Sequence, residues 1–274
     1  MFLLQRRRFD HAFTQNNDRF YATLSPMCNG SGAALQNLER EAVDTAEKFD
    51  ASRTAEYEKQ SRIALAGYDA CHELAACMLA ASLGAGSSAT ILVAGAGGTA
   101  SEIVAAGRLE PSWSFVAVDP SRSMLDLALS RVAAAGLLER TEPVLGVVAD
   151  LPAGRLFDAA TLIGVLHHLP GQDAKQSILR DIATRLKRGA PLILAGNHYA
   201  YASQPLMMAA WAERWRMSGA SGDEIKAKLG KILQGADPPE SEDAVAALLI
   251  AAGFEKPQRF FSSLFWGAWI TRRI

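Results

Sequence analysis

A glycine-rich turn follows a short apolar run in the segment ILVAGAGGTASE, residues 91–102. The glycines of the turn lack a Cβ atom, so a ligand can approach the main chain closely. A helix that begins after the turn would point its free N–H groups at the same place. The next apolar run, residues 114–118, ends in Asp119, at the βαβ distance where an acid can bind both hydroxyls of a ribose. This spacing predicts a ligand that contains a nucleoside.

Two adjacent histidines, His167 and His168, follow another apolar run. The pKa of imidazole lies near neutrality, so a histidine at a strand end could take a proton from a substrate. Of the two, we favour His168 as the catalytic acid–base residue. The three cysteines, Cys28, Cys71 and Cys77, have no spacing typical of a metal site, and we predict no metal.

Short strands that alternate with helices must position these candidates. The predicted strands are residues 91–94, 115–118, 143–148, 157–164 and 191–194, and the predicted helices between them are residues 100–108, 123–135 and 174–187. The alternation indicates an α/β fold with a parallel sheet covered by helices.

Further segments flank this alternation. We predict an N-terminal arm and helical lid over residues 1–85 and a ligand-binding core over residues 86–274. Within the core, residues 197–239 form a helical insertion that adds to the lid. Residues 241–252 form a helix capped by its first residue, and residues 256–272 form an antiparallel hairpin. The arm could be a mobile tail or could order over a ligand.

The composition is that of an ordinary globular protein of 274 residues, 49% hydrophobic and 21% charged. Lys and Arg number 28 against 29 Asp and Glu, so no overall charge favours nucleic acid or an anionic membrane. The start of the chain is not typical of a secretory signal, and no apolar run has the length of a membrane span. We therefore expect a cytoplasmic protein that acts on a small molecule. The oligomeric state stays open.

Several segments, taken in order, resemble the class I S-adenosylmethionine-dependent methyltransferases. They are VAGAGG, VAVDPSRSMLDLA, VADLP, FDAATLIGVLHHL, LKRGAPLILAG and the terminal AAGF and FFSSLFWGAWITRR. The resemblance covers residues 86–274. It implies a Rossmann-like seven-stranded, mostly parallel sheet with an antiparallel last strand, S-adenosylmethionine as cofactor, and a small-molecule acceptor, as in secondary metabolism. The turn also fits the G-x-G-x-x-G/A fingerprint of nicotinamide enzymes, which is a weak motif on its own.

The resemblance also implies which residues bind the cofactor. The turn would face the methionine and ribose portions, and the acid after the second strand would accept the ribose hydroxyls. The acid after the third strand would bind the adenine. The end of the fourth strand would line the sulfonium side. The residues implied are Gly95, Ala96, Gly97, Asp119, Pro120, Asp150, Leu151, Ile163 and Val165. For Asp119 the alternative is a helix cap, and for Asp150 it is a turn aspartate.

The sequence departs from the family pattern at two positions. Val93 stands where the family has an acid that helps to hold the cofactor's ammonium, and Thr99 replaces the third glycine. Glu102 could replace the lost acid. Without a carboxylate partner the amine loses its proton more readily, so S-adenosylmethionine could itself be the substrate, as in the azetidine-2-carboxylate synthases of this fold. A non-catalytic cofactor-binding protein is a third hypothesis.

A looser resemblance to carboxy-S-adenosylmethionine synthase concerns the lid. It implies that Tyr68 reaches the cofactor and that Arg216 reaches a substrate carboxylate, and we count both as candidate catalytic residues. A cation–π contact to the sulfonium could come from Tyr57, Tyr68, Trp211 or Trp215, although the two tryptophans also suit helix packing.

Overall fold

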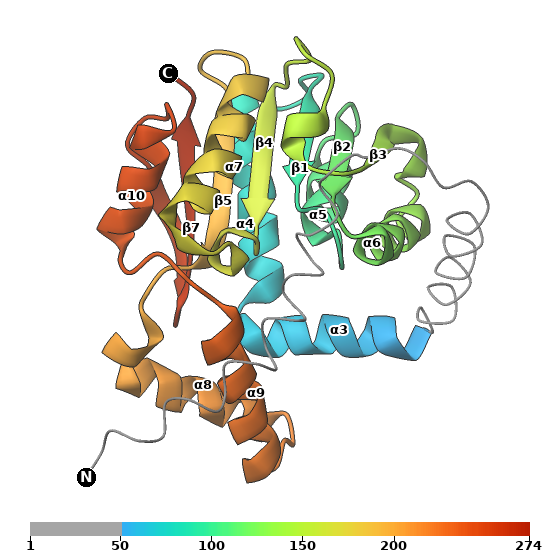
Figure 1. Cartoon of the computed structure of the whole chain (residues 1–274). Helices are drawn as coiled ribbons and strands as arrows, with labels where there is room; N and C mark the ends of the chain where they lie inside the picture. Colours follow the sequence, from blue (N-terminus) through green and yellow to red (C-terminus); the bar gives the residue numbers. More distant parts are fainter. Residues whose placement is uncertain (1–50) are drawn as a thin grey trace, which may run out of the picture. The chain divides into compact units, whose positions relative to one another are not determined.

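A computed structural model describes residues 51–274, with side chains from Tyr57 onward (Figure 1). The described residues lie in one compact unit. The predicted tail or arm at the N-terminus lies outside the described residues.

A seven-stranded sheet forms the centre of the unit, with the strand order β3-β2-β1-β4-β5-β7-β6. Its strands are β1 (Thr90–Ala94), β2 (Ser114–Asp119), β3 (Thr141–Leu145), β4 (Ala159–Ile163), β5 (Pro191–Asn197), β6 (Gln258–Ser263) and β7 (Trp266–Arg272). The first five strands pair in parallel, whereas β7 is antiparallel to both β5 and β6. The predicted mostly parallel sheet, the antiparallel last strand and the terminal hairpin are confirmed.

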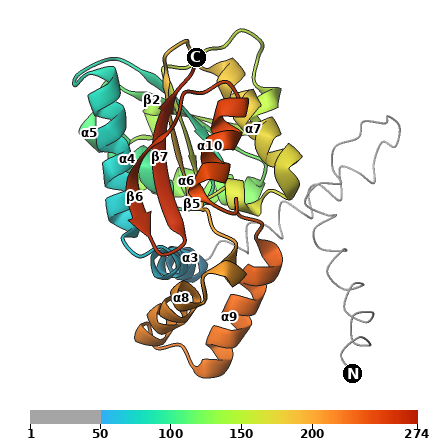
Figure 2. The same ribbon diagram turned by 90° about the vertical axis from the view of Figure 1, so that its left-hand side faces the viewer.

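Helices cover both faces of the sheet, because each carries an apolar stripe that meets one of two core clusters. On one face lie α4 (Tyr68–Leu83), α5 (Ser101–Leu109) and α6 (Arg122–Ala134), and on the other lie α7 (Gly171–Arg185) and α10 (Glu242–Ala251). Figure 2 shows α4 and α5 on one side of the strands and α7 and α10 on the other. The Ser241 hydroxyl caps α10 as predicted, by accepting a hydrogen bond from the main-chain N–H of Ala244.

The strand ends that differ most from the prediction are those of β3 and β5. Strand β3 ends at Leu145, because the Asp150 carboxylate accepts the N–H of Val147 and closes a tight turn, Val148–Asp150. Strand β5 instead runs on to Asn197, since β7 pairs with it over its whole length, from Pro191 opposite Arg272 to Asn197 opposite Trp266. That pairing joins distant parts of the chain, so no local pattern marks it.

The remaining helices lie beyond the carboxyl ends of the strands, at the lower edge in Figure 1. They are α3 (Ala51–Ala64), α8 (Pro205–Met217) and α9 (Gly222–Gly235). The Trp211 indole of α8 donates to the Ala64 carbonyl over 2.8 Å, and the Arg214 guanidinium donates to the Ile63 carbonyl over 3.0 Å. The insertion therefore holds the end of α3. The lid and the boundary at residue 85 stay predictions, while α4 itself packs into the core of the sheet.

No single helix among residues 51–274 is both long and apolar enough to cross a membrane. One bent pair, Tyr57–Ala64 with Tyr68–Leu83, passes the same test of length and composition only when its two parts are joined.

Candidate functional site

The glycine turn between β1 and α5 packs directly against the loop that follows β4. Gly95 has a positive φ of 71°, and its N–H donates to the Val118 carbonyl over 2.8 Å. A Cβ atom at Gly95 would lie 2.2 Å from Val165 Cγ2, so the close approach of the two loops requires glycine. The structure thus brings the ends of β1 and β4 together, as predicted cofactor sites require.

Asp119 at the end of β2 faces the glycine turn. One carboxylate oxygen accepts the N–H of Gly97 and the other the N–H of Ser121, each over 2.8 Å. The side chain is buried, and burial raises its pKa even though both hydrogen bonds act to lower it. A carboxylate oxygen can accept more than one hydrogen bond, so the same group retains capacity for ribose hydroxyls. Pro120, next to it, is exposed.

The other predicted cofactor residues lie around the strand ends. Asp150 is exposed and closes the turn after β3, whereas Leu151 is buried in the core. Ile163 and Val165, at the end of β4, are half-buried. Their roles toward a cofactor stay predictions.

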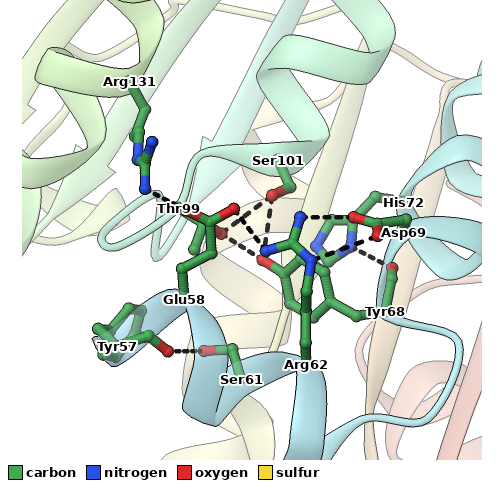
Figure 3. A network of polar contacts seen from close by, with 10 residues as sticks. All are labelled: Tyr57, Glu58, Ser61, Arg62, Tyr68, Asp69, His72, Thr99, Ser101 and Arg131. Carbon is green, nitrogen blue, oxygen red and sulfur yellow. Dashed lines mark hydrogen bonds and ion pairs between the residues drawn. The ribbon is translucent and has the colours of Figure 1, made fainter. Parts of the chain in front are cut away.

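Side chains from α3 and α4 converge on the glycine turn (Figure 3). The Tyr68 hydroxyl contacts the hydroxyls of Thr99 and Ser101, the latter over 3.1 Å, so Tyr68 does reach the turn. Burial raises the pKa of Tyr68 to about 12, which keeps the phenol protonated near neutral pH. The Arg62 guanidinium lies 5.0 Å from the centre of the Tyr68 ring and pairs with Glu58 and Asp69.

Tyr57 from α3 lies on the glycine turn as well. A Cβ atom at Gly98 would lie 2.7 Å from Tyr57 Cε1, so the ring rests on the main chain of the turn. Burial raises the pKa of Tyr57, with Glu102 and Asp119 adding to the effect. The adjacent Glu58 forms an ion pair with Arg131 of α6. Helix α3 is therefore fastened across the turn.

The two histidines differ strongly in environment. They lie in one 3₁₀ turn, Leu166–His168, after β4, and their ring centres are 4.2 Å apart. His167 is buried, and its Nδ1 atom has no hydrogen-bond partner among the described residues. Burial lowers its pKa well below the usual value, so the imidazole is neutral. His168 is exposed, and burial of part of its ring lowers its pKa less.

The comparisons with known proteins agree with this arrangement. Residues 92–192 match the family model described as "Methyltransferase domain". The chain contains a methyltransferase domain. Its sheet is that of the class I S-adenosylmethionine-dependent methyltransferases, and the predicted family and cofactor are confirmed. A search of curated proteins gave no match.

Solved structures share the fold of this chain. Mitomycin 7-O-methyltransferase MmcR is 22% identical, with 76% of this chain and 55% of that chain covered and a TM-score of 0.53. An O-methyltransferase family 2 protein from Planctomyces limnophilus, in complex with apigenin, is 15% identical, with coverages of 75% and 62% and a TM-score of 0.54. An O-methyltransferase family protein from Burkholderia thailandensis is 18% identical, with coverages of 78% and 62% and a TM-score of 0.53. The chain thus spans between 55% and 62% of the length of these proteins.

The acid suggested to replace the one lost at Val93 lies inside the core between the helices and the sheet. Glu102 Oε2 is 3.9 Å from His72 Nε2, and both side chains are almost fully buried. Glu102 and Val93 line the same small cavity, of about 10 Å³, between α4, α5 and the sheet. Burial raises the pKa of Glu102, so its carboxyl is a weaker acid than an exposed one.

The structure does not bring Arg216 to the glycine turn. Its guanidinium is exposed and pairs with Glu213 on the same helix, with Nε to Oε2 at 2.6 Å. Among the described contacts, no other partner holds it. A role for Arg216 toward a substrate carboxylate stays a prediction without geometric support. No group of three or more potential metal ligands lies together in the part of the chain that the structure describes.

Sequence reasoning missed Asn197, at the end of β5, and Trp266, at the start of β7, which lie opposite each other. Asn197 is buried, and Nδ2 donates to the Tyr201 hydroxyl over 2.7 Å, whereas Oδ1 has no partner among the described residues. Trp266 Nε1 is likewise buried and unpartnered there. The only local signal in the sequence was that the polar Asn197 directly follows the apolar residues of β5.

The insertion is also fastened at its far end. The N–H of Asp237 donates to the His167 carbonyl over 2.8 Å, and its carboxylate accepts from the Gly171 N–H and from Lys175 Nζ, both over 2.7 Å. Lys175 is buried and also donates to the carbonyl of Leu169. The loop that carries His167 is thereby held by the last residues of the insertion.

Proposed function

We propose that this protein transfers a methyl group from S-adenosylmethionine to a hydroxyl group of a small molecule, with His167 as the general base. The observation that carries the proposal is the buried, unpartnered Nδ1 atom of His167 at the end of β4, two residues beyond the Val165 that touches the glycine turn. Relatives of the fold named as O-methyltransferases, one of them in complex with apigenin, support oxygen as the acceptor atom.

The residues at the strand ends fit S-adenosylmethionine. At Gly95 and Gly97 a Cβ would overlap Val165 and Asp119, so glycine at these positions lets the main chain of the turn lie directly against the ends of β2 and β4. Asp119 would hold the ribose hydroxyls, and Asp150 would accept from the adenine amino group. Ile163 and Val165 would line the sulfonium side. When bound, the cofactor supplies a methyl group on a positively charged sulfur, which is already an activated leaving group.

The remaining task of the chain is to place the acceptor, exclude water and remove one proton. A neutral imidazole with a free Nδ1 can accept that proton, and its lowered pKa keeps it neutral before the reaction. Tyr57 and Tyr68 close the opposite side of the turn with α3 and α4. On this geometry His167 suits the role better than the exposed His168.

The test incubates the full chain with S-adenosylmethionine and a panel of phenols and alcohols, and follows products by mass spectrometry. We expect S-adenosylhomocysteine together with a methylated acceptor. His167→Gln should lower kcat at least about 100-fold with unchanged affinity for S-adenosylhomocysteine, whereas the matched His168→Gln should change kcat only a few-fold. Unchanged affinity shows that the variant is folded.

Two results would overturn the proposal. Methylthioadenosine formed without any acceptor would indicate that S-adenosylmethionine is itself the substrate. Equal kcat values for His167→Gln and the unmodified protein would remove His167 from the chemistry.

A further inference from the structure

A buried lysine, Lys175 of α7, lies beside the loop that carries His167. Its side chain is only 4% exposed, which is unusual for an ammonium. The three N–H donors of the ammonium have three acceptors, the carbonyls of Leu169 and Gly171, over 2.7 and 3.1 Å, and Asp237 Oδ2, over 2.7 Å. Taking an ammonium out of water is costly, so a buried ion pair seldom adds net stability, and its presence here requires another explanation.

Asp237, near the end of the insertion, joins this ammonium to the His167 loop. One carboxylate oxygen, Oδ2, accepts from Lys175 Nζ and from the N–H of Gly171, both over 2.7 Å. The N–H of Asp237 donates to the His167 carbonyl over 2.8 Å. Burial acts to raise the pKa of the Asp237 carboxyl, but the bonds from Lys175 and Gly171 lower it overall. Asp237 therefore holds the main chain at the residue that carries the imidazole and again at the first residue of α7.

The residues around Asp237 are themselves held in place. Pro238 and Pro239 follow it, both are buried, and their rings restrict the main chain. Two residues before Asp237, the main chain of Gly235 at the end of α9 is hydrogen-bonded to the His168 ring. The end of the insertion thus contacts both histidines of the loop.

We propose that Asp237 and Lys175 are positioning residues, which fix His167 in the place where it takes the proton of the acceptor. Proton transfer requires the base within hydrogen-bond reach of the hydroxyl, and a displacement of about 1 Å can cost about 100-fold in rate. Both residues act through the main chain of the loop and need no contact with the substrate. This assignment rests on the proposed function, because it takes His167 as the base. It also means that His167 and the insertion move together.

Two substitutions at Asp237 separate geometry from charge. Asp237→Ala removes the oxygen that accepts both hydrogen bonds, and the side chain is 58% exposed, so its loss leaves no buried cavity. Asp237→Asn removes the charge but retains an amide oxygen that can accept from the same two donors. We expect Asp237→Ala to lower kcat about 10- to 100-fold with unchanged affinity for S-adenosylhomocysteine, and Asp237→Asn to lower kcat only a few-fold.

A second lysine–aspartate pair provides the matched control. Lys187 Nζ is 2.6 Å from Asp158 Oδ1, and Asp158 Oδ2 accepts the N–H of Thr90 over 2.9 Å. This pair lies at the end of β4 opposite to the one that His167 follows. Asp158→Ala removes the same two kinds of hydrogen bond as Asp237→Ala, and it should leave kcat unchanged.

Two further measurements distinguish positioning from a general structural role. Because positioning acts through His167, Asp237→Ala should lower kcat no further in the His167→Gln background. The second measurement uses the full chain with its five histidines labelled with ¹³C and loaded with S-adenosylhomocysteine. Asp237→Ala should shift the NMR signals of the His167 ring, which His167→Gln assigns, whereas Asp158→Ala should leave them in place.

The inference is overturned if Asp237→Ala leaves kcat or the His167 ring signals unchanged, or if it lowers kcat as much in the His167→Gln background. An equal loss of kcat in Asp158→Ala would overturn it as well. The proposed function fails in a different way. In that case Asp237→Ala shifts the His167 signals as expected, but His167→Gln keeps the kcat of the unmodified protein or no methylated acceptor forms.

Discussion

The glycine turn allows one quantitative test of how its loops fit together. In Gly95→Ala, the new Cβ would lie 2.2 Å from Val165 Cγ2 but 3.5 Å from Val165 Cβ, and the backbone would keep its φ of 71°. A left-handed backbone costs an alanine roughly 1–2 kcal/mol, and overpacking adds about 1–3 kcal/mol. We expect Gly95→Ala to lower the free energy of unfolding by about 2–5 kcal/mol.

A second substitution separates these contributions. Val165→Ala removes Cγ2, so the nearest remaining atom of residue 165 is the Cβ at 3.5 Å, an ordinary contact. In that background Gly95→Ala should cost only the backbone part, about 1–2 kcal/mol, which gives a coupling of about 1–3 kcal/mol. Gly136→Ala is the matched control, because Gly136 has a φ of 73° and nothing within 4 Å of an added Cβ.

The assay is urea denaturation of the full chain, with and without S-adenosylhomocysteine. The reasoning is refuted if Gly95→Ala loses the same free energy in both backgrounds, or if Gly136→Ala loses as much as Gly95→Ala. Either outcome would mean that the Val165 contact does not dictate glycine at this position.

Three further predictions follow from buried or bridging charges. The pKa of His167 is lower in the folded than in the unfolded chain, so protonation favours the unfolded chain. The free energy of unfolding should therefore fall as the pH drops below about 6.5, by at most about 1.4 kcal/mol per pH unit. Urea titrations of His167→Gln should show a weaker dependence of this free energy on pH. Glu58→Gln breaks the ion pair between α3 and Arg131. In stopped-flow experiments it should raise the dissociation rate of S-adenosylhomocysteine a few-fold, and this rate should depend less on salt than in the unmodified protein. The control Glu213→Gln breaks an exposed pair on α8 and should leave the rate unchanged. Lys175→Met leaves the carbonyls that the buried ammonium served without a donor, and should lower the free energy of unfolding by about 1–3 kcal/mol by the same urea assay.

Much of the fold was predictable because its signals are local. The apolar run before the glycine turn, the acid about twenty residues later and the serine cap at Ser241 each depend on a few neighbouring residues. The extension of β5 to Asn197 was not predictable in this way, since it depends on pairing with β7 at the far end of the chain. The predicted end of β3 was wrong for another reason. A hydrogen bond to the Asp150 side chain closes a turn where the apolar pattern still permits a strand.

In the candidate site, too, some features follow from local sequence signals and others depend on distant parts of the chain. Asp119 and the glycines follow from spacing along the sequence, and the structure places them in contact. The proposed preference for His167 over His168 depends on which ring is buried, and adjacent positions in a sequence do not reveal this. Tyr57 contacts Gly98 only because α3 crosses the turn, and Trp266 faces His167 only because β7 lies beside β5.

The inserted segment that carries α8 and α9 leaves and rejoins the sheet region beside the same histidine. It starts after Asn197, which shares the end of the sheet with Trp266 and His167, and its last part returns through Asp237, whose N–H is bonded to the His167 carbonyl. A loop with neighbouring ends can be lengthened or exchanged at a small entropic cost, since closure entropy grows only with the logarithm of length. Evolution or an engineer can therefore lengthen or replace this segment while the half of the sheet that carries Asp119 stays as it is.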